Sequence, residues 1–186
     1  MRAPRLAAGF LVLALALVLP PAAPPALAAS AKEINRDADA SLVKLYERVP
    51  EARALSQKAA GMLVFPSIVK AGFLFGAQYG EGVLRVKGRN AGYYNTVAAS
   101  YGLQAGVQSF GYVLFFMTDS ALNYLNKSEG FEIGVGPSIV VLDAGKAKTL
   151  TTTTGQSDIY AFIFDQKGLM AGLALEGTKI SPIKRS

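Results

Sequence analysis

The hydrophobic and polar positions follow a helical period in the first part of the chain. Apolar residues recur at steps of three or four at Ile34, Ala38, Leu42, Leu45 and Val49. This spacing places them on one side of an amphipathic helix. Ser30 and Glu33 have the spacing of a capping box, and Pro50 suits the first position of a second, shorter helix. With Gly61 as a C-terminal stop, the pattern predicts two helices within residues 30–60.

After these helices the pattern becomes that of strands, with short apolar runs between glycines and prolines. The predicted strands cover residues 62–65, 72–80, 82–88, 92–108, 110–118, 131–145, 158–165 and 168–181. Pro66 closes the first run, Glu81 marks a hairpin or a bulge, and Gln166-Lys167 form a hairpin turn. The run at 110–118 is apolar at nearly every position, so it should be a central strand buried on both faces.

Asp119 is a suitable N-cap for a short helix over residues 120–127. Glycines recur four residues apart at Gly72, Gly76 and Gly80, at Gly102 and Gly106, and at Gly168 and Gly172. On a strand such glycines share a face, where they let the sheet bend or let a ring lie on bare backbone; direct ligand contact is the alternative. We expect one α+β domain: a strongly bent antiparallel β-sheet or partial barrel with the N-terminal helices packed on it, and with Phe115 and Phe162 buried.

The first thirty residues have the layout of a secretory leader. Arg2 and Arg5 form a basic start, residues 9–19 form an uncharged apolar run, and Ala26-Leu27-Ala28 is an A-x-A cleavage pattern. The apolar run is shorter than the roughly 20 residues of a membrane span, and an uncleaved anchor is the alternative interpretation.

This layout predicts a cleaved signal peptide at residues 1–29 and one domain at 30–186. The domain would hold the helices at 30–60 and a β-rich region at 62–183. The chain has no cysteine, which excludes a lipoprotein anchor. The mature protein should therefore be periplasmic or secreted.

Composition narrows the chemistry that is available. The 186-residue chain has no cysteine and no histidine. This excludes disulfides, Cys/His zinc sites, and catalysis of the Ser-His-Asp or Cys-His kind. The carboxylates are scattered, and no phosphate-binding or nucleic-acid-binding motif occurs. We therefore expect no enzymatic activity, no cofactor, no metal and no nucleic acid partner.

The charge is positive. Lys and Arg number 19 against 13 Asp and Glu, and removal of the leader would leave 17 against 13, a net charge of +4. Arg85, Lys87 and Arg89 gather on one predicted strand and its turn. Such a cluster can contact lipid phosphates at about 1 kcal/mol per charge. A strand and turn that are merely solvated are the alternative.

Four stretches carry a family resemblance. They are KAAGMLVFPSIVKAGFLFGAQYGEGVL (58–84), YGLQAGVQSFGYVLFFMTDSALNYL (101–125), GVGPSIVV (134–141) and DIYAFIFDQKGLMAGLALEGTKISP (158–182). They resemble the SYLF family, also called the Ysc84-type lipid- and actin-binding domain, and the last stretch is similar to its KGLFAG and SLEG closing motif. The resemblance spans about residues 32–183, nearly the whole mature chain.

The resemblance implies a binding module of α+β type. Eukaryotic members bind phosphoinositide-rich membranes, some bind and bundle actin filaments, and bacterial members are exported proteins described as lipid-binding. Membrane binding in the family is attributed to an amphipathic N-terminal helix and a basic surface. The lipid-binding residues expected here are Lys32, Arg36, Lys44, Arg48, Arg85, Lys87 and Arg89.

Two functions stay open at this point. The first is a non-enzymatic lipid-binding protein of the cell envelope, whose partner is an anionic phospholipid or membrane surface. It would hold head groups by its basic residues, assisted by apolar side chains of the first helix. The second is a structural or protein-interaction module of the periplasm with an envelope protein partner. Family-type actin binding would apply only outside the native compartment.

Overall fold

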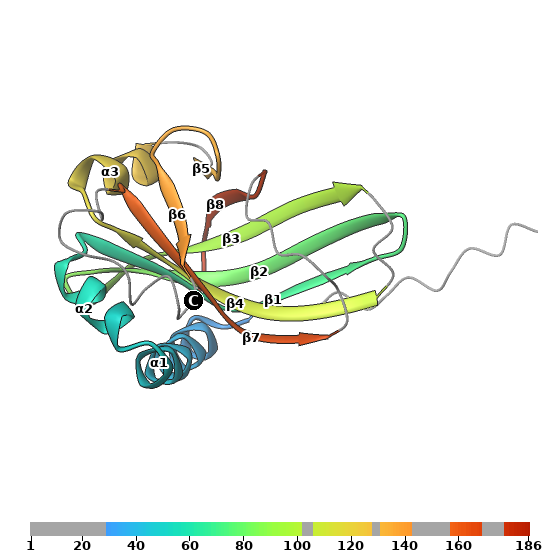
Figure 1. Cartoon of the computed structure of the whole chain (residues 1–186), viewed down its shortest axis with the longest axis horizontal. Coiled ribbons are helices and arrows are strands. Elements are labelled where there is room, and N and C mark those ends of the chain that lie inside the picture. The colour runs from blue at the N-terminus through green and yellow to red at the C-terminus, as the bar shows by residue number, and fades with distance from the viewer. Residues whose placement is uncertain (1–28, 102–105, 128–130, 143–156, 169–176) are drawn as a thin grey trace, which may run out of the picture.

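One curled sheet organises the chain, and helices cover parts of its two faces (Figure 1). The computed structural model describes residues 29–101, 106–127, 131–142, 157–168 and 177–186. The helices in these residues are α1 (Ala31–Arg48), α2 (Pro50–Lys58) and α3 (Asp119–Lys127). The strands are β1 (Gly61–Gly72), β2 (Phe75–Val86), β3 (Arg89–Tyr101), β4 (Gly106–Phe116), β5 (Phe131–Glu132), β6 (Ile139–Leu142), β7 (Ile159–Gly168) and β8 (Lys179–Ile183).

The strand order in the described part of the chain is β5-β8-β3-β2-β1-β4-β7-β6. Neighbouring strands are antiparallel, except that β6 and β7 are parallel. This half-barrel with α1 and α2 packed on one side confirms the predicted α+β domain. The predicted signal peptide falls on residues 1–29, of which 1–28 lie outside the described residues.

The N-terminal helices begin where the sequence predicts. The Ser30 hydroxyl accepts a hydrogen bond from Glu33 N, and Ser30 N donates to the Glu33 carboxylate at 2.8 Å, which completes the capping box. Pro50 is the first residue of α2. The predicted stop at Gly61 is wrong. Ala59 already has an extended conformation that ends the helix without a glycine, and Gly61 begins β1.

The third helix is in the predicted place, but its cap differs. The Thr118 hydroxyl accepts a hydrogen bond from Ala121 N at 3.1 Å, which is the contact that an N-cap side chain makes. Asp119 is the first helical residue, so its prediction as the cap is wrong by one position. Its carboxylate still lies in the first turn, where the helix dipole favours negative charge.

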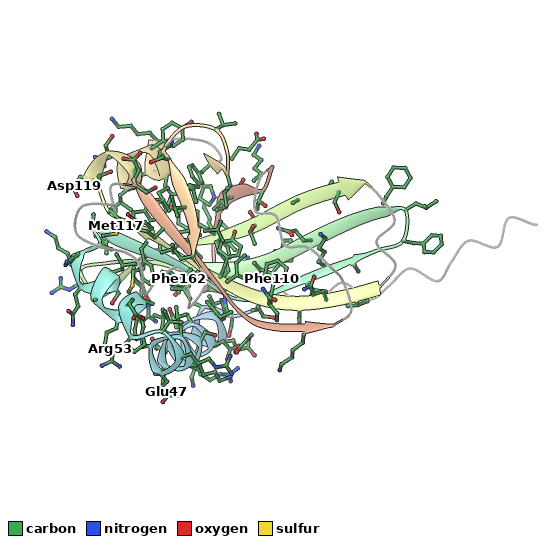
Figure 2. The ribbon with its side chains drawn as sticks, viewed as in Figure 1. Glu47, Arg53, Phe110, Met117, Asp119 and Phe162 are labelled. Atoms are coloured by element: carbon green, nitrogen blue, oxygen red, sulfur yellow. The ribbon has the colours of Figure 1, made fainter. Side chains whose placement is uncertain are left out.

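One face of the sheet, here called the α1 face, packs against α1 and α2. The apolar side of α1 is buried there at Ile34, Ala38, Leu42 and Leu45. Its partners on the strands are Val64, Val83, Val113, Phe115, Leu142, Tyr160, Phe162 and Phe164. Phe162 lies between the sheet and the helices, whereas Glu47 and Arg53 point away from the sheet (Figure 2). The apolar residues that recur with a helical period in the sequence are therefore the ones that contact the sheet.

The opposite face, here called the α3 face, packs against α3. It holds Leu63, Phe65, Ile68, Leu84, Phe110, Tyr112, Leu114 and Phe116, with Ala121, Leu122 and Leu125 from the helix. β4 contributes to both cores and is buried from Gly111 to Phe116, as predicted for a central strand. Phe115 and Phe162 are buried as expected, with their rings edge to face and 5.7 Å apart.

β1 is longer than predicted, because Pro66 does not end it. The register shifts against both β2 and β4 around Pro66, which places a bulge where proline has no N–H to give to the ladder. β1 then continues to Gly72, and its hairpin to β2 lies at residues 73–74. Glu81 pairs with Ser67 inside β2, so the predicted hairpin at Glu81 is wrong and the bulge lies on the neighbouring strand.

The predicted hairpin across Gln166-Lys167 is also wrong. β7 continues through these residues to Gly168, which still pairs with Gln108 of β4. β8 instead pairs with β3, and strands β2, β1 and β4 lie between β3 and β7 in the sheet. Periodicity carries no information on which partner a strand selects. Residues 169–176 lie outside the described residues.

Bare glycine backbone lets aromatic rings lie against the strands. A Cβ atom on Gly82 would lie 2.3 Å from the Val64 carbonyl oxygen and 2.7 Å from the Phe65 ring. One on Gly111 would lie 2.3 Å from the Phe164 ring. Both distances are far below van der Waals contact, so these positions need glycine.

Among the glycines at four-residue spacing, Gly72, Gly80 and Gly168 are closely packed, whereas a Cβ atom on Gly106 would meet no atom within 4 Å. Gly72 and Gly76 face each other across the β1–β2 pair, and a Cβ on Gly72 would lie 2.5 Å from Gly76 Cα. A Cβ on Gly80 would lie 2.5 Å from the Ile68 side chain. These contacts support the architectural interpretation of the glycines. Gly102 and Gly172 lie outside the described residues.

Gly82→Ala should lower the free energy of unfolding by about 1–3 kcal/mol, because the added methyl group meets backbone and must displace a strand. Gly92→Ala is the matched control. Its Cβ would meet only the Tyr94 ring edge at 3.4 Å, so its effect should stay within about 0.5 kcal/mol. Urea unfolding measures both variants, and equal stability of the two would contradict the packing role of Gly82.

Candidate functional site

The α1 helix crosses the α1 face with its charged side outward. Asn35 contacts β3, Asp39 contacts β2, and Tyr46 contacts Met62 of β1. Farther along, Arg48 reaches Asp165 of β7. The apolar side of the helix is occupied by the sheet in this arrangement, so the exposed part of α1 consists mainly of charged side chains.

The turn between β2 and β3 places two of the predicted cations in solvent. Lys87 and Gly88 both have positive φ, 52° and 73°, as in the type I′ turn that suits the twist of a two-residue hairpin. Lys87 and the following Arg89 are exposed.

Hydrogen bonds join this turn to the first half of α1. Asn90 Nδ2 donates to Asn35 Oδ1 at 2.8 Å, and Asn35 Nδ2 donates to the Tyr93 hydroxyl at 2.8 Å. Lys32 and Arg36 lie within one helical turn of Asn35 and are exposed. The structure therefore brings four of the seven predicted residues to one region, called the basic end: Lys32, Arg36, Lys87 and Arg89.

Lys184 is a further cation near the basic end that the sequence did not single out. It follows β8, two residues before Ser186, whose carbonyl oxygen accepts a hydrogen bond from Ala31 N at 3.3 Å. Lys184 is exposed. Only the β3–β8 pairing brings it beside the start of α1, and no local sequence signal indicates that pairing.

Arg85 has a different environment from the other predicted residues. Its side chain is largely covered and forms an ion pair with Asp39 of α1. Arg85 lies on the same side of β2 as Val83, the side that packs against α1. The pair therefore connects the helix to the strand, and the Arg85 guanidinium is less available to a ligand than Lys87 or Arg89.

Lys44 and Arg48 lie toward the far end of α1, away from the basic end. Both pair with Asp165, at 3.6 Å for Lys44 and 3.1 Å for Arg48. Asp165 has a φ of 50°, which is uncommon for a residue with a side chain. These exposed pairs are worth little individually, but they lower the net charge at this end of the helix.

A pocket of about 260 Å³ lies beside this second group. Its polar lining residues are Asp37, Ser41, Lys44, Ser67, Ser109, Asp165 and Lys167. Two carboxylates balance two ammonium groups, so the pocket has no net attraction for an anion. The basic end has four cations, of which Arg36 pairs with Asp37, so it is the better place for an anionic ligand.

Glu81, in the middle of β2, contacts residues near both termini of the domain, Ala29 and Arg185. It is 9% exposed and forms an ion pair with Arg185, while the Tyr79 hydroxyl donates to it at 2.6 Å. Burial opposes the charge, but the hydrogen bonds from Arg185, Tyr79 and the Ala29 backbone outweigh it and lower the pKa of the Glu81 carboxyl. This contact fixes the start of α1 and hence the position of the basic end.

Clusters of metal ligands and helices of membrane-spanning type are both absent from the described residues. Within them, no group of three or more Asp or Glu side chains is placed to hold a metal ion. None of their helices combines the length and the hydropathy that a membrane crossing requires. What the surface does present is exposed charge on α1 and on the β2–β3 turn, which are features of a binding domain.

A protein-family model matches the second half of the chain. The Ysc84 family, described as Las17-binding protein actin regulator, matches residues 97–185. No curated protein matches the chain. Residues 97–185 thus match the Ysc84 (SYLF) family that the sequence resembles, which is a family of binding domains. All seven predicted lipid-binding residues precede the matched range, so they remain predictions.

Glu81→Gln should lower the free energy of unfolding at pH 7 by about 1–3 kcal/mol, because it leaves the covered Arg185 without its anion. The folded-state pKa of Glu81 is lowered, so its stabilising effect is present above the unfolded value of 4.5 and is lost as the pH falls through the folded pKa. The difference between wild type and variant should therefore shrink below about pH 4.5.

Urea unfolding between pH 3 and pH 7 checks this dependence. Glu47→Gln is the control, because Glu47 is exposed on the outer side of α1. Its effect should be small at every pH. A difference for Glu81→Gln that stays constant over this range would show that the carboxylate charge has no part in the contact.

Proposed function

We propose that this protein is a non-enzymatic lipid-binding protein of the cell envelope that contacts phospholipid head groups through its basic end. The arrangement of Lys32, Arg36, Lys87 and Arg89 is the observation that carries the proposal. Two elements that are far apart in sequence are joined by the Asn35–Asn90 hydrogen bond, and each contributes two exposed cations.

The expected strength of such a contact is modest. A Lys or Arg near an anionic membrane surface contributes about 1 kcal/mol. Four such charges would contribute up to about 4 kcal/mol, a factor of roughly a thousand in partitioning. Binding of this kind is reversible and depends on salt, because the Debye length falls to about 3 Å at 1 M ionic strength.

The envelope location rests on the leader-like N-terminus. The basic start, apolar run and A-x-A pattern within residues 1–29 support export and cleavage. In that compartment the proposed partner is an anionic phospholipid or membrane surface. No cofactor or nucleic acid is part of the proposal.

The second candidate function is a protein-interaction module with an envelope protein partner. The family description favours it, because it names a protein that binds another protein, Las17, and regulates actin. In this case the basic end would be a solvated surface or a protein contact, and binding to vesicles would not depend on it.

The charge-neutralising variant Lys32→Gln, Lys87→Gln, Arg89→Gln should reduce partitioning into anionic vesicles by up to roughly a hundredfold. Arg85 is left unchanged because its pair with Asp39 supports α1. Co-sedimentation with vesicles that contain 0 to about 40% anionic phospholipid, in low and high salt, measures the effect.

The matched control is Lys58→Gln, Lys127→Gln, Lys179→Gln, which removes the same charge from exposed positions on α2, α3 and β8. A third variant, Lys44→Gln with Arg48→Gln, tests the far end of α1. Equal losses for the basic-end variant and the control would mean that only net charge matters. Absence of vesicle binding by the wild type would leave the protein-interaction module as the better hypothesis.

A further inference from the structure

The hairpin between β1 and β2 ends in three exposed apolar side chains. Phe73 is 67% exposed, Leu74 is 47% exposed and Phe75 is 72% exposed. Phe73 and Leu74 lie in the bend that connects the two strands, and Phe75 begins β2. The strands β1 to β4 extend to this side beyond all three described helices, so the tip lies at an end of the sheet that no described helix reaches (Figure 1).

A row of apolar side chains continues from this tip along the α1 face. Val69, Tyr79 and Val97 are in register across β1, β2 and β3. They are 50%, 48% and 44% exposed, and Val107 of β4 is 62% exposed. Exposed apolar residues that occur singly need no explanation, but a contiguous group at a projecting end indicates an interaction site.

The charge distribution around the tip identifies the kind of partner. Residues 71–80 and 90–118 contain no charged side chain. The nearest charges on the adjoining strands are Lys70 on β1 and Lys167 on β7. Lys167 is two strands away from Val69, because Ser109 of β4 pairs with both residues. An uncharged apolar tip with ammonium groups behind it matches a bilayer, where hydrocarbon lies beneath anionic head groups.

We propose that the tip Phe73-Leu74-Phe75 inserts into the boundary between head groups and acyl chains of a phospholipid bilayer. This inference rests on the proposed function and adds to it the part of the protein that enters the membrane. Aromatic side chains favour this boundary, and a projecting tip can enter a fluid surface without a matching cavity. The apolar side of α1 cannot do so in this arrangement, since the sheet covers it.

The tip and the basic end lie at opposite ends of β2, so both reach one bilayer when β2 lies along its surface. β2 has 12 residues, so the β1–β2 bend and the β2–β3 turn are up to about 36 Å apart at about 3.3 Å per residue. Their contributions can therefore be removed separately. A variant in the bend should also leave the fold intact, because Phe73 and Leu74 contribute no side chain to either buried core.

The test uses the absence of tryptophan from the chain. Phe73→Trp puts a single fluorophore at the tip, and Val43→Trp puts one on the exposed side of α1, where Val43 is 54% exposed. Each full-length protein is mixed with vesicles of phosphatidylglycerol and phosphatidylcholine, with and without brominated acyl chains. We expect a blue shift and quenching by brominated lipid for the tip fluorophore, and neither for the α1 fluorophore.

A second measurement is the partition coefficient of the double variant Phe73→Ser, Leu74→Ser on the same vesicles. We expect a loss of at least about tenfold, which corresponds to about 1.4 kcal/mol. The thermal unfolding midpoint should match that of the wild type. The double variant of Val43→Ser with Val135→Ser, two exposed valines away from the tip, is the control and should bind like the wild type.

The outcomes separate the two proposals. Vesicle binding that is salt-sensitive, with no quenching of the tip fluorophore and no loss for the serine variant, overturns the insertion and leaves the proposed function standing. Absence of any vesicle binding overturns both. A blue shift that needs no vesicles and rises with protein concentration shows that a second copy of the chain covers the tip, and this also overturns the insertion.

Discussion

The burial of the apolar side of α1 against the sheet determines which surfaces are left for binding. Ile34, Ala38, Leu42 and Leu45 are almost fully covered by strands β1, β2, β4 and β7. Pulling the helix off would expose all of them together with their partners, at roughly 1.5–3 kcal/mol for each large side chain. The helix therefore acts as part of the core. Its contribution at the surface is charge, and an apolar contact with another molecule must come from elsewhere.

The sequence predicted those parts of the fold that depend on local periodicity. The helical period gave α1 and α2 with their capping box and proline, and the uninterrupted apolar run gave β4 as the central strand. Apart from the helix boundaries at Gly61 and Asp119, the errors concern which strands pair and where they turn. Glu81 between two glycines resembles a turn, but it lies inside β2 because the β1 bulge is across from it. Strand pairing is a long-range property that local patterns do not encode.

The sequence could supply candidate cations for the site, but neither their arrangement nor the position of Lys184 beside them could be predicted. All seven cations are in α1, β2 or β3 or the turn between these strands, and six of them are exposed. Arg85 could not be separated from Lys87 by sequence, because its ion-pair partner, Asp39, is more than forty positions away. Lys32 lies near Lys87 because of the Asn35–Asn90 hydrogen bond. Lys44 and Arg48 form a separate group because both pair with Asp165.

The uncharged run at residues 90–118 shows why the exposed apolar surface that continues from the tip is invisible in the sequence. From Gly111 to Phe116 this run is buried inside the protein, whereas Val97 and Val107 are exposed. Removing charge from a segment serves burial in a protein core and contact with hydrocarbon equally well, because both exclude water. In the structure, the length of the strands decides which part of the run is buried and which part stays exposed. A helix lying across the sheet covers about 10–12 Å of strand. Strands of 11 to 13 residues reach well past it, so their far ends keep an apolar surface that no described helix covers.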